Sequence, residues 1–304
     1  MTRYIPLVGG LGNQLFIVAY GLFQNLYDDH EVQFCLGATG FGNVNHGHNL
    51  LEEIEFGFPV RARLERPVEA WVAKGQRLAS RKGLGKLIEA TFSTVHLDEG
   101  VPLDRRVSYE KKNLNRHLKI RDSGYFQNPA YLAKLQEMGI LTEIVPAAPS
   151  SWFKETRDRI SENGGIGIHV RRGDFEKTGG PGVLSVEYYK RALEDATSSD
   201  GGNRVFIFSD SIESVEREFL EHNWDFEIEF VSPPPESSPI ESMALLSQFT
   251  SLIISNSTFS WWSATTGQEH KTVMSPTRWS RIGPEPAISL NLAGWTLREA
   301  LWRT

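Results

Sequence analysis

The sequence has little cysteine and no long apolar run. Its 304 residues include one cysteine, Cys35, so no disulfide can form within the chain, and no Cys/His cluster has the spacing of a zinc site. A single cysteine fits a reducing compartment. The most apolar N-terminal stretch, residues 5–23, is interrupted by three glycines and two amides, whereas a spanning helix needs about 20 mostly apolar residues. We therefore expect a cytoplasmic protein with no transmembrane segment, at most peripheral on the inner face of the membrane.

A large excess of charge of one sign is also absent. The net charge of −6 argues against a general nucleic-acid binder. The charge is uneven, however: residues 61–121 contain 15 Lys and Arg against 7 Asp and Glu, a local balance of +8. This scattered pattern is typical of a solvated helical face, and the alternative is a surface that meets phosphates or anionic lipid.

What is present is ordinary globular composition, with 40% hydrophobic residues, and a length that predicts two domains of roughly 150 residues. Residues 146–151, with two prolines, predict a linker. The expected domains are therefore 1–148 and 149–304.

Short strands alternating with helices predict a parallel, doubly wound α/β sheet in each domain. In the first, residues 4–8 and 31–36 read as strands around a helix, and residues 67–135 as mostly helical with a short strand at 124–127. In the second, the expected strands are 166–170, 204–208, 226–231, 252–255 and 272–275, and the expected helices are 186–197, 212–222, 240–248 and 260–268.

A glycine-rich turn with Gly10, Gly12 and Asn13 follows the first strand and begins a helix, so a ligand could approach backbone N–H groups there. A dinucleotide fingerprint is an alternative, since Glu31 stands where a ribose-binding acid should, but Leu15 occupies the third glycine position. No Gly-Lys-Ser/Thr follows, which excludes a P-loop. A tight turn for packing is the remaining interpretation.

Two adjacent arginines, Arg171 and Arg172, follow the strand at 166–170. Such a pair at the carboxyl end of a strand favours an anionic ligand, and an arginine fork suits a diphosphate. His169 projects from the same face as Arg171, and Asp174 could orient a guanidinium or accept a proton. The alternative is a structural Arg–Asp bridge.

A third motif, with Ser257, Thr258 and Phe259, follows the strand at 252–255 and begins a helix. Hydroxyls and free N–H groups at a helix N-terminus can hold a phosphate, although a simple N-cap is equally common. Glu241 begins the preceding helix. It could accept the N–H donors of guanine, or merely complement the helix dipole.

Taken together, these motifs resemble the α-1,2-fucosyltransferases, and the α-1,6- and protein-O-fucosyltransferases share the His-x-Arg-Arg core. The resemblance extends from residue 4 to about 280, with Phe175 where the family usually has Tyr and Thr258 where Ser is commoner. The strings that carry it are GGLGNQLF (9–16), GYFQ (124–127), HVRRGDF (169–175), FIFSD (206–210), NSTFSWWSA (256–264) and PTRW (276–279).

The resemblance implies a GT-B fold, in which two Rossmann-like domains face each other across a cleft. The N-terminal domain would take the acceptor and the C-terminal domain GDP-fucose, with the last helix packing back on the N-terminal domain. The implied reaction moves L-fucose to O2 of galactose in a glycan, with inversion and without a metal or other cofactor. No Asp-x-Asp pair occurs in the chain.

The resemblance also implies roles for the motif residues. Arg171 would hold the β-phosphate of the departing GDP, opposite Ser257, Thr258 and Phe259. Glu241 would read guanine with His169 nearby, and Gly10, Gly12 and Asn13 would reach the donor from the other domain. Arg172 would bind near the donor, support the loop or orient Asp174. Asp174 is the first candidate for the catalytic base and Glu176 the second.

Two other functions stay open from the sequence. One is a fucosyltransferase of another linkage or using another GDP-sugar, and the other is a non-catalytic module that binds a GDP-sugar. If the chain is a transferase, the basic stretch at 61–121 would be a dock for a phosphate-bearing or membrane-bound acceptor.

Overall fold

A computed structural model of the chain describes residues 2–28, 31–36, 53–56, 62–64, 93–95, 119–122, 124–178, 181–200, 203–269, 271–282, 285–286 and 288–303. The chain forms two compact units. The first comprises residues 1–52 and 56–141, and the second residues 53–55 and 142–304. The chain therefore passes between the units three times, and residues 53–55 belong to the second unit although residues on either side belong to the first.

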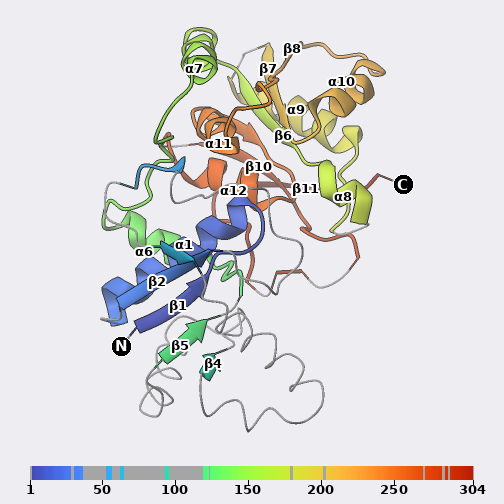
Figure 1. Cartoon of the computed structure of the whole chain (residues 1–304). Helices are drawn as coiled ribbons and strands as arrows, with labels where there is room; N and C mark the ends of the chain where they lie inside the picture. The colour runs from blue at the N-terminus through green and yellow to red at the C-terminus, as the bar shows by residue number, and fades with distance from the viewer. Residues whose placement is uncertain are drawn as a thin grey trace. The chain divides into compact units, whose positions relative to one another are not determined.

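The first unit contains a parallel five-stranded sheet in the order β3-β2-β1-β5-β4 (Figure 1). Its elements are β1 (Thr2–Pro6), α1 (Leu11–Asp28), β2 (Glu31–Leu36), β3 (Ala62–Leu64), β4 (Ser93–Val95), β5 (Lys119–Asp122) and α6 (Pro129–Gln136). The buried side of α1 contacts α6 and the loop before it through aromatic rings: Tyr20 stacks on Phe126 of the loop at 4.0 Å between centroids and meets the edge of Tyr131 of α6 at 5.3 Å. Burying such rings stabilises the helix against the unit's core.

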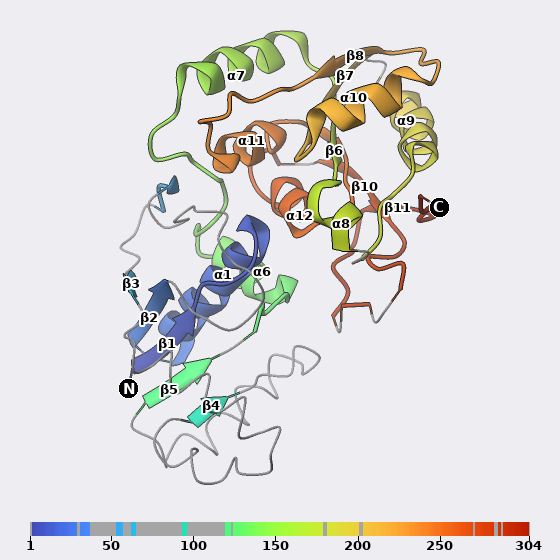
Figure 2. The ribbon, with the colours of Figure 1, turned by 45° about the vertical axis from the view of Figure 1, so that its right-hand side comes forward.

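The second unit contains a parallel six-stranded sheet in the order β11-β10-β9-β6-β7-β8. Its helices lie on either side of this sheet, as Figures 1 and 2 show. The elements are α7 (Ser151–Asn163), β6 (Ile166–Val170), α8 (Gly173–Thr178), α9 (Val186–Asp200), β7 (Arg204–Ser209), α10 (Ile212–Leu220), β8 (Glu227–Phe230), α11 (Pro239–Leu246), β9 (Ser251–Ile253), α12 (Thr258–Thr265), β10 (Thr272–Pro276) and β11 (Thr296–Arg298).

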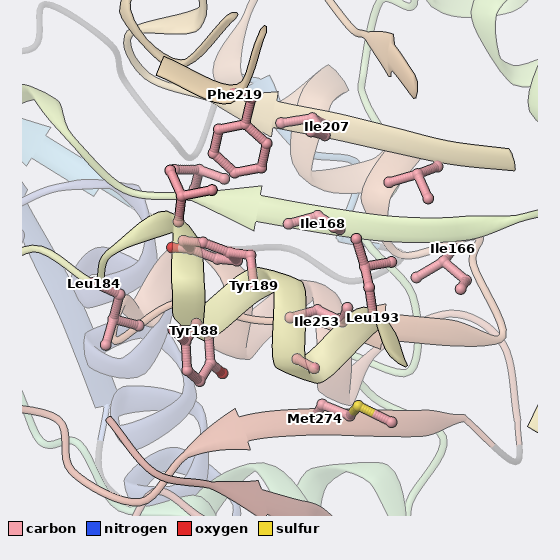
Figure 3. Packing of buried hydrophobic residues seen from close by; sticks show 14 of the residues in the cluster. Ile166, Ile168, Leu184, Tyr188, Tyr189, Leu193, Ile207, Phe219, Ile253 and Met274 are labelled. Atoms are coloured by element: carbon pink, nitrogen blue, oxygen red, sulfur yellow. The ribbon is translucent and has the colours of Figure 1, made fainter. Parts of the chain in front are cut away.

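The core of the second unit lies between α9 and the central strands (Figure 3). Tyr189 and Leu193 of α9 are fully buried against Ile168 of β6 and Ile207 of β7, and Phe219 of α10 closes one side. Strand β6 is buried along its whole length. It therefore reads as a continuous apolar run, which is typical of a strand covered on both faces.

Each sheet has a point where the strand order reverses. In the second unit the chain enters at β6, continues to β7 and β8 on one side, and returns to β9 on the other side of β6. In the first unit β1 has β2 on one side and β5 on the other. Ligands of open α/β sheets bind outside the carboxyl ends of the strands at such a reversal. The loops after β6 and β9, and those after β1 and β5, are therefore the expected ligand sites.

The predicted fold class is confirmed, and the main errors lie at the ends of the second unit and in the middle of the first. The strand expected at 124–127 is wrong, because β5 lies earlier, at Lys119–Asp122. The expected last helix is not formed by the described residues 288–303, of which residues 296–298 form β11 and pair with β10. In the segment predicted as a linker, Pro146 forms an antiparallel β-bridge with Ile54. Most of the basic stretch at 61–121 lies outside the described residues.

Candidate donor site

The loops that follow β6 and β9 lie at the reversal point of the second sheet and carry the two motifs of this unit. Strands β6 and β9 are direct neighbours, with Ile168 opposite Ile253. Side chains from the two loops meet: the rings of His169 and Phe259 stack at 4.9 Å between centroids. The structure therefore brings together the His-x-Arg-Arg motif and the N-terminus of α12, which lie more than 80 residues apart in the sequence.

Arg171 is the partly exposed cation of this site, with 21% of its side chain accessible. Its guanidinium lies between two carboxylates, pairing with Asp174 and, through Nη1 at 3.1 Å, with Asp210. The guanidinium carbon also lies 5.0 Å from the centre of the Phe175 ring. Its Nε is buried with no hydrogen-bond partner among the described residues. The two carboxylates hold the head group in place, and its accessible part is what a ligand oxygen could meet.

Arg172 is fully buried and its donors go to protein acceptors. Its Nη2 lies 2.9 Å from Glu218 Oε2, its Nε 3.2 Å from the same oxygen, and its Nη1 donates to the carbonyls of Arg171 and Leu184. A buried guanidinium needs such partners to offset the cost of desolvation. The geometry supports a structural role for Arg172 beneath the loop.

His169 is 3% exposed, and its Nδ1 lies 2.9 Å from Ser255 Oγ. Burial, and then the positive charge of Arg171, lower the pKa of His169 from 6.5 to about 3. The imidazole is therefore neutral near pH 7. It fixes the end of β6 to the end of β9 and offers a flat neutral ring, rather than a second positive charge.

The N-terminus of α12 is arranged as a conventional N-cap. Ser257 Oγ accepts a 3.3 Å hydrogen bond from the backbone N–H of Phe259. Asn256 donates from Nδ2 to the carbonyls of Gly182 and Trp279, and so fixes the loop before the helix. Thr258 and Phe259 are half-buried, which leaves part of this turn accessible beside His169. The predicted residues of this motif thus lie together at one helix end.

The two carboxylates considered for the catalytic base have different surroundings. Asp174 is 55% exposed and pairs with Arg171. Glu176, two residues further along α8, lies 2.7 Å from Arg303 Nη1 and 3.7 Å from Arg172 Nε. Of the two side chains, that of Asp174 is the more exposed, at 55% against 33% for Glu176.

Sequence reasoning gave Asp210 no role, although it ends the motif FIFSD. This residue follows β7, the neighbour of β6, and its two oxygens hold the Arg171 side chain and, at 2.8 Å, the backbone N–H of Arg172. Gly173 makes room for it: a Cβ there would lie 2.1 Å from Asp210 Oδ2, at a φ of +39°. The signal that could have revealed Asp210 is its position at the carboxyl end of a strand adjacent to β6.

Glu241 is buried at 2% exposure in the first turn of α11. Its Oε1 accepts a 2.6 Å hydrogen bond from the backbone N–H of Ser150, and its Oε2 a 2.9 Å bond from the Ser150 hydroxyl. Because Ser150 is the N-cap of α7, this carboxylate joins two helices of the unit. The described contacts support a structural role for Glu241, and the guanine-reading role remains a prediction.

In the first unit, the glycine-rich turn meets the loop after β5. Gln127 Nε2 donates to Asn13 Oδ1 at 2.9 Å, and Gln14 Nε2 donates to the carbonyl of Gly9 at 2.9 Å. Gly10 is half-buried, and a Cβ added there would meet nothing within 4 Å, whereas Gly12 is buried. Two motifs therefore also lie together at the reversal point of this sheet. That these glycines and Asn13 reach the donor stays a prediction.

The model of the family described as Glycosyl transferase family 11 matches residues 106–289, which is more than half of the chain. The chain belongs to glycosyl transferase family 11. This confirms the resemblance at the level of the family, and the chain is a glycosyltransferase.

Individual relatives of this family 11 glycosyltransferase match it to different extents. The O-antigen biosynthesis glycosyltransferase WbnK of Escherichia coli is 32% identical over 117 residues, which cover 37% of this chain and 38% of that protein. An alpha-1,2-colitosyltransferase of Escherichia coli is 25% identical over 269 residues, or 85% of each protein. A glycosyl transferase of family 9 from Veillonella parvula superposes with a TM-score of 0.51 at 10% identity, covering 100% of this chain and 88% of that one. This last likeness shows the GT-B-like α/β fold alone.

None of the helices within the described residues combines the length and the apolar composition that crossing a membrane requires.

Proposed function

We propose that this family 11 transferase moves L-fucose from GDP-fucose to O2 of a galactose residue, forming an α-1,2 linkage in an O-antigen unit or a related glycan. The observation that carries the proposal is Arg171, a partly exposed guanidinium held by two carboxylates directly after β6, the strand at the reversal point of the second sheet. A family 11 match and relatives named for O-antigen and α-1,2 transfer support it.

The proposed mechanism is a direct displacement with inversion. The galactose O2 attacks the anomeric carbon of fucose from the side opposite GDP, and the electron pair of the breaking C–O bond goes to the β-phosphate oxygen. Negative charge grows on that oxygen, so Arg171, already fixed by Asp174 and Asp210, stabilises the transition state more than the ground state. The O2 proton goes to Asp174, whose carboxylate is the more exposed of the two candidates. The proposed reaction requires no metal ion.

The experiment that tests this proposal follows GDP binding and product linkage together. GDP should protect the chain against thermal unfolding without added metal, and Arg171→Ala should remove that protection. ADP is the control, because equal protection by ADP would contradict guanine recognition. Linkage determination of the product from GDP-fucose and galactose-terminated acceptors then tests the α-1,2 assignment. Failure to release GDP with any such acceptor would favour a non-catalytic GDP-sugar module.

The similarity to a colitosyltransferase makes GDP-colitose a second candidate donor. The alpha-1,2-colitosyltransferase aligns with 85% of this chain, and colitose differs from L-fucose by the absence of the hydroxyl at C3. Competition between GDP-fucose and GDP-colitose at equal concentration decides between the two donors. A site that hydrogen-bonds the C3 hydroxyl should prefer fucose strongly, because the sugar lacking it would leave a polar group unpaired.

A further inference from the structure

The last described residues of the chain pair with the segment that precedes α9. Two backbone hydrogen bonds of 2.8 Å, and an antiparallel bridge between Leu184 and Trp302, join residues 301–303 to residues 183–185. Gly182 permits this approach: its φ is +94°, and a Cβ there would lie 3.0 Å from the Trp302 ring. The C-terminal segment is therefore held against the chain between α8 and α9.

The same short segment also contacts both motifs of the candidate donor site. The carbonyl of Leu184 accepts a 3.0 Å hydrogen bond from Arg172 Nη1. The carbonyl of Gly182 accepts a 3.1 Å bond from Asn256, which immediately precedes the α12 N-cap. Residues 182–184 thus connect the C-terminal segment to the loops after β6 and β9.

A cluster of four charges completes this connection. Arg303 Nη1 lies 2.7 Å from Glu176 and 3.9 Å from Glu218, and Glu218 also holds the buried Arg172 at 2.9 Å. Two arginines thus balance two glutamates. Arg303 and Glu176 are 48% and 33% exposed, whereas Arg172 is fully buried. Figure 1 shows α8 and the C-terminus of the chain on the same side of the unit.

Helix α8 is consequently held by arginines at two acidic residues of its first turn. Asp174 pairs with Arg171 inside the loop, and Glu176 pairs with Arg303 from the far end of the chain. Without Arg303, the one cation that Glu176 would keep among the described residues is Arg172 at 3.7 Å, which is already paired with Glu218. The cluster would then hold one uncompensated negative charge, two residues from the partner of Arg171.

We propose that Arg303 is a positioning residue of the donor site: it neutralises Glu176 and holds α8, so that Arg171 can receive a nucleotide diphosphate. The inference rests on the proposed function, because it names GDP as the ligand whose binding depends on Arg303. The physical reason is that an unpaired carboxylate beside an anion site disfavours anion binding.

The test uses the full chain and two measurements. Calorimetry gives the affinity for GDP, and steady-state kinetics with GDP-fucose give KM and kcat. Arg303→Met should weaken GDP binding by at least about fivefold and raise KM for GDP-fucose more than it lowers kcat. Arg303→Lys, which keeps the charge, should recover most of the affinity. Arg191→Met, which breaks an exposed ion pair with Glu187 on α9, is the matched control.

The deciding variant also removes the negative charge of Glu176, which Arg303→Met leaves without its arginine partner. The double variant Glu176→Gln with Arg303→Met should bind GDP more tightly than Arg303→Met alone and as tightly as Glu176→Gln alone, an outcome that a purely structural role for Arg303 would not give. If Arg303→Met does not fold, the GDP affinities of Arg303→Lys and of the double variant are each compared with that of the wild type instead.

Two outcomes would overturn the inference while leaving the proposed function intact. One is GDP affinity of Arg303→Met within twofold of a wild-type chain that does bind GDP, and the other is a double variant no better than the single one. A wild-type chain that binds no GDP would instead overturn the proposed function, and the inference with it.

Discussion

Protonation of His169 should destabilise the second unit as the pH falls below neutrality. The pKa of this histidine is lowered to about 3 in the folded chain, and its ordinary value is 6.5. Between these two values the unfolded chain binds a proton that the folded chain does not, so stability falls as the pH falls. Linkage gives a loss of about 2 kcal/mol between pH 7 and pH 5, rising to about 4 kcal/mol at pH 3.

The assay is denaturant unfolding at pH 7 and pH 5, followed by tryptophan fluorescence. Trp261 and Trp262 are fully buried on α12, next to the His169 site, and report on this unit. His169→Gln keeps a partner for Ser255 and cannot titrate, so the difference in unfolding free energy between wild type and variant should shrink by about 2 kcal/mol from pH 7 to pH 5. His222→Gln, at an exposed histidine, is the control for replacing a histidine by glutamine elsewhere in the same unit.

A constant difference between wild type and His169→Gln over this pH range would refute the reasoning. It would mean that the folded chain accommodates an imidazolium beside Arg171, with water or a carboxylate reaching the ring. A shrinkage of equal size for His222→Gln would show that the effect is not specific to the buried site.

Two further predictions concern stability. Gly173→Ala places a Cβ 2.1 Å from Asp210 Oδ2 at a φ of +39°, so it should lower the thermal midpoint and weaken GDP protection, whereas Gly10→Ala, with open space around it, should leave the midpoint nearly unchanged. Glu241→Ala removes both acceptors of Ser150 and should lower the free energy of unfolding in urea by about 1–3 kcal/mol. A loss below about 0.5 kcal/mol, the size typical of exposed substitutions, would show that Glu241 does not join α7 to α11.

Local sequence patterns predicted the parts of the site that depend on neighbouring residues. Strand β6 and the arginines after it are contiguous, so an apolar run followed by charge was enough to place Arg171 at a strand end. The contacts of Asp210 and Glu218 with the arginine loop could not be predicted in this way. They depend on the parallel pairing of β6 with β7, which brings residues about 40 positions apart in the sequence close together. No local pattern carries that information.

The C-terminal segment shows a different failure, in which an element implied by the resemblance gives way to tertiary pairing. The resemblance to GT-B transferases implied a last helix in the C-terminal domain. In the structure residues 296–298 form β11 beside β10, and residues 301–303 pair with residues 183–185. Backbone hydrogen bonds to two distant segments decided the conformation, and single-sequence propensity does not contain them.

The excursion of residues 53–55 into the second unit has a consequence for how this protein can be divided. Their pairing with residues 145–147 and the bond from Ser238 to Glu53 belong to the unit that starts at Thr142. A fragment beginning at Thr142 would expose backbone groups that residues 53–55 now satisfy. Exchange of whole units between relatives would therefore have to carry two separate stretches of sequence, so recombination at a single crossover would leave one half without part of its own fold.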